Sequence, residues 1–146
     1  MAFVTNKKAR FNYEILEKFE AGIELHGFEV KAIKNNQGSL DGAHVAVRGG
    51  EAFLLGFDLP PYQAKNTPTD YERTRTRKLL LTKKEIQRIG DEGAKKGTAV
   101  IPLSIFGKGR KLKIDIALAR GKKKFDKRET IKKRDTDREI RREMKR

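Results

Sequence analysis

Apolar and polar residues alternate over a long stretch near the start of the chain. Between residues 11 and 25 the odd positions are apolar, with Glu17 as the one interruption: Phe11, Tyr13, Ile15, Phe19, Ala21, Ile23 and Leu25. A period of two is typical of a strand with one buried face. Because this stretch is much longer than the usual strand of roughly five or six residues, we expect a bend, for which Gly22 is the candidate.

The period changes after this strand. Apolar residues at helical spacing predict a short helix over residues 27–35, which the sequence Asn35-Asn36-Gln37-Gly38 ends. Two apolar runs, 43–47 and 52–57, then flank the sequence Arg48-Gly49-Gly50-Glu51. Glycine can take the positive φ of a tight turn, so this arrangement predicts a β-hairpin.

The middle of the chain contains a polar segment followed by a helix signal. Residues 63–77 are polar and have no period, which predicts a mobile loop. A short buried segment follows at residues 79–81. The sequence Thr82-Lys83-Lys84-Glu85 has the pattern of a capping box, so we expect a helix to begin there and to end near Gly93 or Gly97.

A second hairpin is predicted before the C-terminal segment. Residues 98–106 are apolar, Gly107-Lys108-Gly109 is a turn sequence, and residues 112–118 alternate again. About six strands and two or three short helices, joined by hairpins, favour a mainly β protein. We expect a small antiparallel barrel, closed or nearly closed, because closure hides strand edges.

The composition changes at Gly121, and we expect two parts: a barrel, residues 1–121, and a basic C-terminal tail, residues 122–146. The tail holds 13 Lys and Arg and six Asp and Glu, a net charge of +7. Its four large apolar residues are too scattered to bury one face of a helix. We therefore expect the tail to be disordered when free and to fold on contact with a polyanion.

Net charge is the feature that most restricts the function. The whole chain carries 35 Lys and Arg against 20 Asp and Glu, a formal net charge of +15. Such an excess is explained by an anionic partner, which can be a nucleic acid, an anionic membrane surface or an acidic protein. Solubility alone is the simpler alternative.

Composition also excludes several kinds of site. With no cysteine, the chain has no disulfide, zinc knuckle or thiol nucleophile. His26 and His44 do not belong to a metal-ligand pattern, and we expect both to be solvated. The first residues lack the apolar run of a signal peptide, and no apolar segment is long enough to cross a bilayer. The sequence therefore predicts a cytoplasmic protein without metal or cofactor.

Six short blocks follow one another between residues 6 and 128: Asn6-Lys7-Lys8-Ala9-Arg10, Phe19-Glu20-Ala21-Gly22-Ile23, Glu29-Val30-Lys31, Gly50-Glu51-Ala52-Phe53-Leu54, Arg75-Thr76-Arg77-Lys78-Leu79-Leu80-Leu81 and Ala119-Arg120-Gly121-Lys122-Lys123-Lys124-Phe125-Asp126-Lys127-Arg128. Lysine-rich runs are common, so one block alone is not specific, but six blocks in this order and spacing are. Together they resemble the bacterial small protein B family.

This resemblance implies a fold, a function and a set of partners. The fold is an OB-like (oligonucleotide-binding) β-barrel with flanking helices. The function is binding to the tRNA-like domain of transfer-messenger RNA and its delivery to stalled ribosomes for trans-translation, which rescues the ribosome and tags the incomplete protein. The tail enters the decoding centre of the small subunit and the empty mRNA channel. We therefore expect a monomer that is not an enzyme and has no membrane partner or small-molecule substrate.

The resemblance also assigns residues to the RNA surface. Asn6, Glu20, Leu80 and Lys113 stand at matching positions, and we add nearby cations that suit phosphate neutralisation: Lys7, Arg10, Arg75, Arg77 and Lys78. Contact with the decoding centre is assigned to Lys122, Lys123, Lys124, Phe125, Asp126, Lys127 and Arg128. Phe125 departs from the family, which often has Tyr or His there; Phe125 can stack on a base but cannot donate a hydrogen bond. The loop before Thr74 matches poorly, and no contact is carried over to it.

Each of these assignments has a plainer alternative. Glu20 can accept a hydrogen bond from a base or pair with a cation across the sheet. Lys113 can be an ordinary solvated lysine, and Leu80 can belong to the core instead of packing on a base. The tail can be a nonspecific electrostatic tether, although Phe125 lies among cations as aromatic residues do in base-stacking sites.

Two other classes of protein remain as rivals. A structural ribosomal protein has the same size, charge and basic tail, but it would stay bound to ribosomal subunits washed at high salt. An enzyme that modifies or cleaves RNA needs a nucleophile, a metal cluster or an acid/base pair, and the sequence contains no such pattern. Gly107-Lys108-Gly109 lacks the further glycine and Ser/Thr of a nucleotide-binding loop. The sequence therefore favours an RNA-binding factor.

Overall fold

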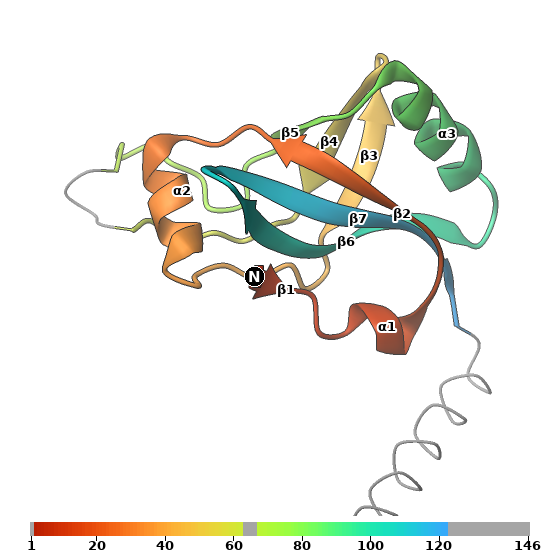
Figure 1. Ribbon diagram of the computed structural model, residues 1–146, viewed down its shortest axis with the longest axis horizontal. Helices are drawn as coiled ribbons and strands as arrows, with labels where there is room; N and C mark the ends of the chain where they lie inside the picture. Colours follow the sequence, from red (N-terminus) through yellow and green to blue (C-terminus); the bar gives the residue numbers. More distant parts are fainter. Residues whose placement is uncertain (1, 63–66, 123–146) are drawn as a thin grey trace, which may run out of the picture.

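The structure is a computed structural model that describes residues 2–62 and 67–122, and it confirms the predicted mainly β class (Figure 1). The strands in these ranges are β1 (Ala2–Thr5), β2 (Tyr13–Ile23), β3 (His44–Arg48), β4 (Glu51–Leu55), β5 (Arg77–Leu80), β6 (Thr98–Lys108) and β7 (Lys111–Gly121). The helices are α1 (Ala9–Asn12), α2 (Gly27–Lys34) and α3 (Lys83–Gly93). β1 was not predicted, and α1 occupies the first residues of the strand that the alternation predicted.

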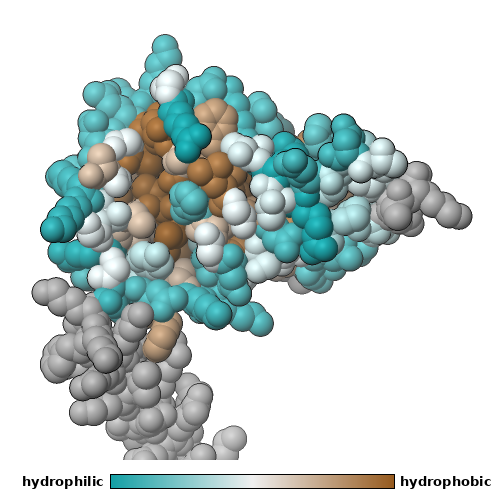
Figure 2. All heavy atoms as spheres, turned by 180° about the vertical axis from the view of Figure 1, so that it is seen from behind, coloured by the Kyte–Doolittle hydropathy of each residue, from teal (hydrophilic) through white to brown (hydrophobic). Residues whose placement is uncertain are grey.

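The strands form one antiparallel sheet in the order β1-β6-β7-β2-β5-β4-β3. The sheet curls until β3 lies against β6, but no ladder joins these two strands in the described residues. The fold is therefore barrel-like with two remaining edges, β1 and β3, so that of the two expected forms the sheet has the incompletely closed one. Seen from behind, the molecule shows a patch of apolar surface framed by hydrophilic side chains (Figure 2).

A β-bulge in β2 divides the predicted strand between two faces of the sheet. The ladder to β7 skips Leu16, which is 45% exposed. One extra residue reverses the alternation beyond it. Phe19 therefore faces the main core, while Tyr13 and Ile15 pack on the outer face. The irregularity lies at this bulge and not at Gly22, which is regularly paired on both sides.

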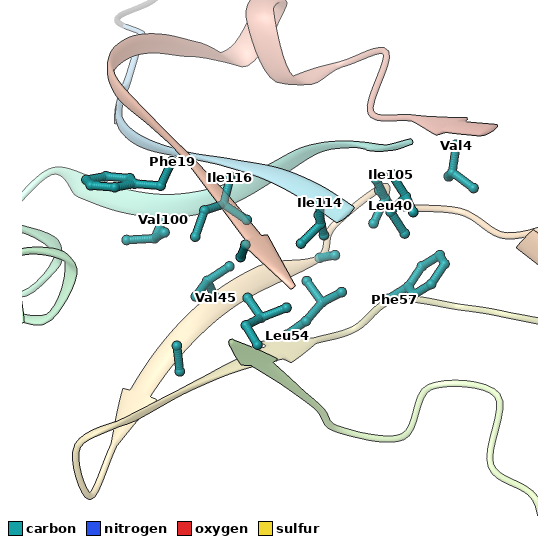
Figure 3. Packing of buried hydrophobic residues seen from close by; sticks show 14 of the residues in the cluster. Val4, Phe19, Leu40, Val45, Leu54, Phe57, Val100, Ile105, Ile114 and Ile116 are labelled. Atoms are coloured by element: carbon teal, nitrogen blue, oxygen red, sulfur yellow. The ribbon is translucent and has the colours of Figure 1, made fainter. Parts of the chain in front are cut away.

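The main core fills the inside of the curled sheet. Side chains from β1 through β7 meet there, among them Val4, Phe19, Leu40, Val45, Leu54, Phe57, Val100, Ile105, Ile114 and Ile116 (Figure 3). Complete burial of a large apolar side chain contributes roughly 1.5–3 kcal/mol. A smaller cluster of Ala9, Ile101, Ala117 and Ala119 joins α1 to the outer face of β6 and β7. Both faces of the sheet are thus covered at this end.

The ends of α3 and the turn between β3 and β4 lie where the sequence predicted them. The Oγ1 of Thr82 accepts from the main-chain N–H of Glu85 at 3.2 Å, and the Glu85 carboxylate accepts from the N–H of Thr82 at 3.1 Å, so α3 begins with the capping box. It ends at Gly93. In the turn between β3 and β4, Gly49 and Gly50 have φ values of 58° and 77°. None of the helices in the described ranges is long and apolar enough to span a bilayer.

Part of the predicted loop is bonded to the rest of the fold. The N–H of Leu59 donates to the carbonyl of Arg73 at 3.0 Å, and the Arg73 guanidinium pairs with Asp58 at 2.9 Å. Residues 67–76 form no helix or strand, as predicted for a loop, but they are bonded to the rest of the fold, and Arg77, the last residue of the predicted loop, already belongs to β5. Residues 63–66 lie outside the described ranges.

Candidate nucleic-acid interface

The outer face of the sheet carries a row of residues from three neighbouring strands. Lys113 of β7, Gly22 of β2 and Leu80 of β5 are successive partners across the two ladders. Partners in an antiparallel ladder share a face, and this one points away from the core because Ile114 and Leu79 are buried. Leu80 is 51% exposed, so it takes the outward orientation and not the core position.

This row combines a cation with apolar side chains. A Cβ at Gly22 would lie 3.1 Å from the Cβ of Leu80, so glycine is what allows Leu80 to lie close over β2. Phe106 of β6 extends the row as the ladder partner of Lys113. Sequence reasoning missed Phe106, because it ends an almost continuous apolar run in which outward and inward residues look alike. A lysine between two apolar groups can neutralise a phosphate while a base packs beside it.

Glu20 lies on the same outer face, two residues before Gly22. Both of its carboxylate oxygens accept from the Nζ of Lys108 at 3.2 Å, so the alternative of an ion pair is present. The pair is exposed, however, and an exposed pair contributes less than about 1 kcal/mol. Glu20 can therefore exchange Lys108 for a donor on a ligand at little cost.

Asp115, the ladder partner of Glu20, is a second carboxylate at this place that sequence reasoning did not single out. Burial raises the pKa of Asp115, the negative charge of Glu20 raises it further, and Lys18 lowers it. Asp115 forms no ion pair with any residue in the described part of the chain. The two carboxylates thus make an acidic spot on a basic surface, which favours base amino and imino groups over phosphates.

The predicted residues of the first block surround α1. The side-chain amide of Asn6 donates to the carbonyl of Pro102 at 2.9 Å, and its main-chain N–H donates to the carbonyl of Leu103 at 2.8 Å. Asn6 therefore fixes the connection between β1 and α1 onto the edge of β6. Lys7 is exposed, and Arg10 lies in α1 with its side chain outside the described part of the structure.

Arg77 does not lie on this surface. Its side chain is completely buried, and its guanidinium donates to the Glu29 carboxylate at 2.9 Å, to the carbonyl of Phe57 at 2.9 Å and to the hydroxyl of Tyr71 at 3.0 Å. The prediction that Arg77 neutralises a phosphate is therefore wrong, because a buried carboxylate already neutralises its charge. The partner was not recognisable in the sequence, since Glu29 lies 48 residues earlier.

Arg75 binds the same carboxylate from the solvent side, with 26% of its side chain exposed. Burial raises the pKa of Glu29, but hydrogen bonds from Arg75 and from the main-chain N–H of His26, together with the charge of Arg77, outweigh it and lower the pKa to about 2. The Tyr71 hydroxyl is also bonded to Glu29, at 3.2 Å. The cluster of Glu29, Tyr71, Arg75 and Arg77 joins α2 to the start of β5 and to the chain before it.

Lys78 is the one of the three cations predicted in this segment that lies on the outer face of the sheet. It precedes Leu80 by two residues on β5, and side chains alternate along a strand, so the two share a face. Its Nζ pairs with Glu51 at 3.1 Å, and both side chains are exposed. Lys78 therefore extends the candidate surface from Leu80 toward β4.

The tail begins beside α1. The main-chain N–H of Lys122 donates to the carbonyl of Asn12 at 2.9 Å, and Lys122 is the last residue that the structure describes. The other residues predicted at the decoding centre lie outside the described ranges: Lys123, Lys124, Phe125, Asp126, Lys127 and Arg128. Their assignment stays a prediction.

Comparison with known proteins agrees with the sequence blocks. A family model described as SmpB protein matches residues 3–146. The chain belongs to the SmpB protein family. The resemblance found in the six blocks is thereby confirmed, and the family match runs from within β1 to the last residue of the tail.

Individual SmpB relatives are similar over almost their full length. An SsrA-binding protein of Methylibium petroleiphilum is 49% identical over 139 residues, 95% of this chain and 90% of that protein. One of Mycoplasma mycoides subsp. mycoides is 47% identical over 135 residues, 92% of this chain and 91% of that protein. A solved chain from "tmRNA-SmpB: a journey to the center of the bacterial ribosome" aligns with a TM-score of 0.68 and 38% identity, over 82% of this chain and 84% of that one.

Proposed function

We propose that this chain binds the tRNA-like domain of transfer-messenger RNA and delivers it to stalled ribosomes for trans-translation. The observation that carries the proposal is its similarity to SsrA-binding proteins over more than nine-tenths of its length. The solved relative, which bears the description of a tmRNA–SmpB structure at the bacterial ribosome, supports the same two partners.

The charge and the outer face of the sheet suit such a ligand. A net charge of +15 neutralises phosphates and releases their counterions, so affinity falls as salt rises. The row of Lys113, Gly22 and Leu80 offers a phosphate contact beside an apolar platform. Glu20 and Asp115 repel phosphates, and they favour an orientation that presents base donors to them.

The two parts of the chain have different tasks in this proposal. Residues 1–121 bind transfer-messenger RNA, and residues 122–146 reach the decoding centre and the empty mRNA channel. The block from Lys122 to Arg128 contacts ribosomal RNA, with Phe125 stacked on a base among cations. The protein binds and positions RNA in the cytoplasm, where the ribosomes are, and the ribosome itself makes the peptide bonds.

A binding experiment with two matched lysine variants tests the RNA surface. Lys113→Ala should weaken filter binding of transfer-messenger RNA at fixed salt, because it removes a cation from the proposed contact row. Lys84→Ala removes the same charge from the exposed side of α3 and should have a much smaller effect. Equal losses for the two variants would show that only total charge matters.

The ribosomal-protein alternative predicts a different distribution in cells. A structural ribosomal protein remains in subunits washed at high salt, whether or not transfer-messenger RNA is present. We expect this chain to be lost from washed subunits and to copurify with transfer-messenger RNA. Retention in washed subunits of a strain without that RNA contradicts the proposal.

A further inference from the structure

A second apolar surface lies on the outer face of β3 and β4, on the side of the molecule shown in Figure 2. Along β4, Leu54 is completely buried, while Phe53 and Leu55 on either side of it face outward and are half-buried. Their ladder partners on β3 are Ala46 and His44. Phe53 is therefore an aromatic ring in the middle of an accessible sheet face.

Phe53 borders two shallow grooves. One has a volume of about 420 Å³ and is lined by Ala46, Arg48, Gly49, Phe53, Leu55 and Thr76. The other has a volume of about 490 Å³ and shares Phe53 and Thr76 with the first; its other lining residues are Glu24, Leu25, His26, Arg75 and Lys78. A contiguous apolar surface of this kind, framed by polar groups, marks a binding site more often than a single exposed side chain does.

Cations outnumber carboxylates at the rim of these grooves: Arg48, Arg75 and Lys78 lie there with Glu24 and with Glu51, the ladder partner of Arg48. Lys78 is the ladder partner of Phe53 on β5, and Arg48 follows Ala46 on the same face of β3. Arg48 forms no ion pair within the described ranges, and the pair between Lys78 and Glu51 is exposed and therefore weak. A flat apolar ring with Lys78 beside it on β5 and Arg48 near it on β3 fits a ligand that is both planar and anionic.

We infer that Phe53, Arg48 and Lys78 form a second RNA contact, which takes unpaired nucleotides by stacking a base on Phe53 and neutralising its phosphates. The inference rests on the proposed function in taking RNA as the ligand. Bases in a duplex do not present their faces, so the site selects loops or single strands. A second copy of this chain fits poorly, because its cations would meet the same cations.

This contact continues the row on the outer face of the sheet. Lys78 and Leu80 lie two residues apart on β5, and Leu80 is the partner of Gly22. An RNA strand can therefore pass around the barrel from Lys113 to Phe53 without leaving the outer face. The single-stranded part of the ligand would lie at the β3–β4 end of this path.

A tryptophan at position 53 gives a direct test, because the chain contains no other tryptophan. Titration of Phe53→Trp with a single-stranded oligoribonucleotide should quench its fluorescence to saturation as a base stacks on the indole. The same oligonucleotide in a duplex, and heparin, which is a polyanion without bases, should quench it little. Tyr62→Trp is the control, since Tyr62 is exposed and lies outside both grooves.

The affinity for the single-stranded oligonucleotide should also depend on the ring at position 53. Phe53→Ala should weaken binding of the single-stranded oligonucleotide about tenfold, and Phe53→Tyr should retain it. If Phe53→Ala does not fold, the fluorescence titration of Phe53→Trp still tests whether a base stacks at position 53. No quenching by the single strand, equal quenching by heparin, or a signal that depends on protein concentration without RNA overturns the inference.

The inference and the proposed function fail in different ways. Lys113→Ala combined with Phe53→Trp should keep the quenching by a short single strand while losing affinity for transfer-messenger RNA. If Phe53→Trp is not quenched but Lys113→Ala still weakens binding of transfer-messenger RNA, the second contact alone is wrong. If quenching is normal but the protein does not prefer transfer-messenger RNA over other structured RNA, the proposed function alone is wrong.

Discussion

The carboxylate of Glu29 and the guanidinium of Arg77 form an ion pair at 2.8 Å in which both side chains are completely buried. Glu29 belongs to α2 and Arg77 to β5, so the pair connects two distant parts of the chain. Removing two charges from water is costly, and the attraction between them offsets that cost only while both are present. Replacing either residue alone should therefore leave the other without the opposite charge that is buried beside it and destabilise the fold.

Arg77→Ala should lower the free energy of unfolding by roughly 3–5 kcal/mol, because it leaves the buried Glu29 carboxylate without the cation that is buried beside it. Arg73→Ala is the control: Arg73 pairs with Asp58, but both side chains are about half exposed, and the expected loss is below about 1 kcal/mol. Urea unfolding at neutral pH measures both values. Equal, small losses would show that the buried pair does not hold α2 to β5.

Acid should weaken the fold through Glu29. The pKa of this carboxyl is lowered from 4.5 to about 2 in the folded protein, so the unfolded chain takes up a proton first as the pH falls. The stabilisation is complete above pH 4.5 and is lost between pH 4.5 and about 2, by roughly 3 kcal/mol. Urea unfolding at several pH values should show this slope, and Glu29→Gln should remove it. A slope that Glu29→Gln leaves unchanged must come from other carboxylates.

Local features of the fold could be predicted from the sequence, and the bulge could not. The Thr82–Glu85 capping box and the glycine turn between β3 and β4 depend on neighbours in the chain, which the sequence displays directly. At the bulge the alternation does break, because Leu16 is apolar and Glu17 is polar, but one break in the pattern does not distinguish a bulge from an ordinary exposed glutamate. The odd positions stay apolar on both sides of the bulge because both faces of the sheet are covered there, one by the core and the other by α1.

In the candidate site, too, the sequence predicted what depends on neighbours in the chain and missed what depends on distant contacts. Alternation was enough to place Glu20 and Lys113 on an outer face, since their neighbours along the strand are apolar. It could not distinguish Arg77 from Lys78, because both are cations beside an apolar run. What separates them is Glu29, which only the fold brings to Arg77. A contact between residues so far apart in sequence leaves no periodic signal.

Glu20→Gln tests whether the carboxylate of Glu20 accepts a hydrogen bond from a base of the RNA. If Glu20 accepts a hydrogen bond from the RNA, the affinity for transfer-messenger RNA should fall by roughly 1–3 kcal/mol. Glu14→Gln is a matched control, because Glu14 lies on the same strand and forms a similar exposed pair with Arg120. It removes the same charge and should leave binding unchanged or slightly tighter. Filter binding at one salt concentration compares them, and a tighter Glu20→Gln variant would remove Glu20 from the site.

Ending the chain after Lys122 should separate the two tasks. The truncated protein keeps the whole sheet and the hydrogen bond from Lys122 to Asn12, so its melting temperature and its affinity for transfer-messenger RNA should stay close to those of the full chain. Tagging of nascent chains on stalled ribosomes should fail in a reconstituted translation assay. Complete loss of RNA binding after this cut would contradict the division at residue 121.

Phe125 tests how the tail acts once the barrel has bound its RNA. Phe125→Ala should impair tagging on stalled ribosomes while leaving the affinity of the barrel for transfer-messenger RNA unchanged, because stacking on a base contributes roughly 1–3 kcal/mol and is lost with the ring. Phe125→Tyr keeps the ring and should be tolerated. Ile140→Ala is the control, since it removes an apolar side chain from the same tail outside the block from Lys122 to Arg128. If Phe125→Ala is as active as Ile140→Ala, the ring does not stack and the tail acts through its charge alone. Tagging would then fall steadily as lysines of that block are replaced by glutamine, whichever lysine is chosen.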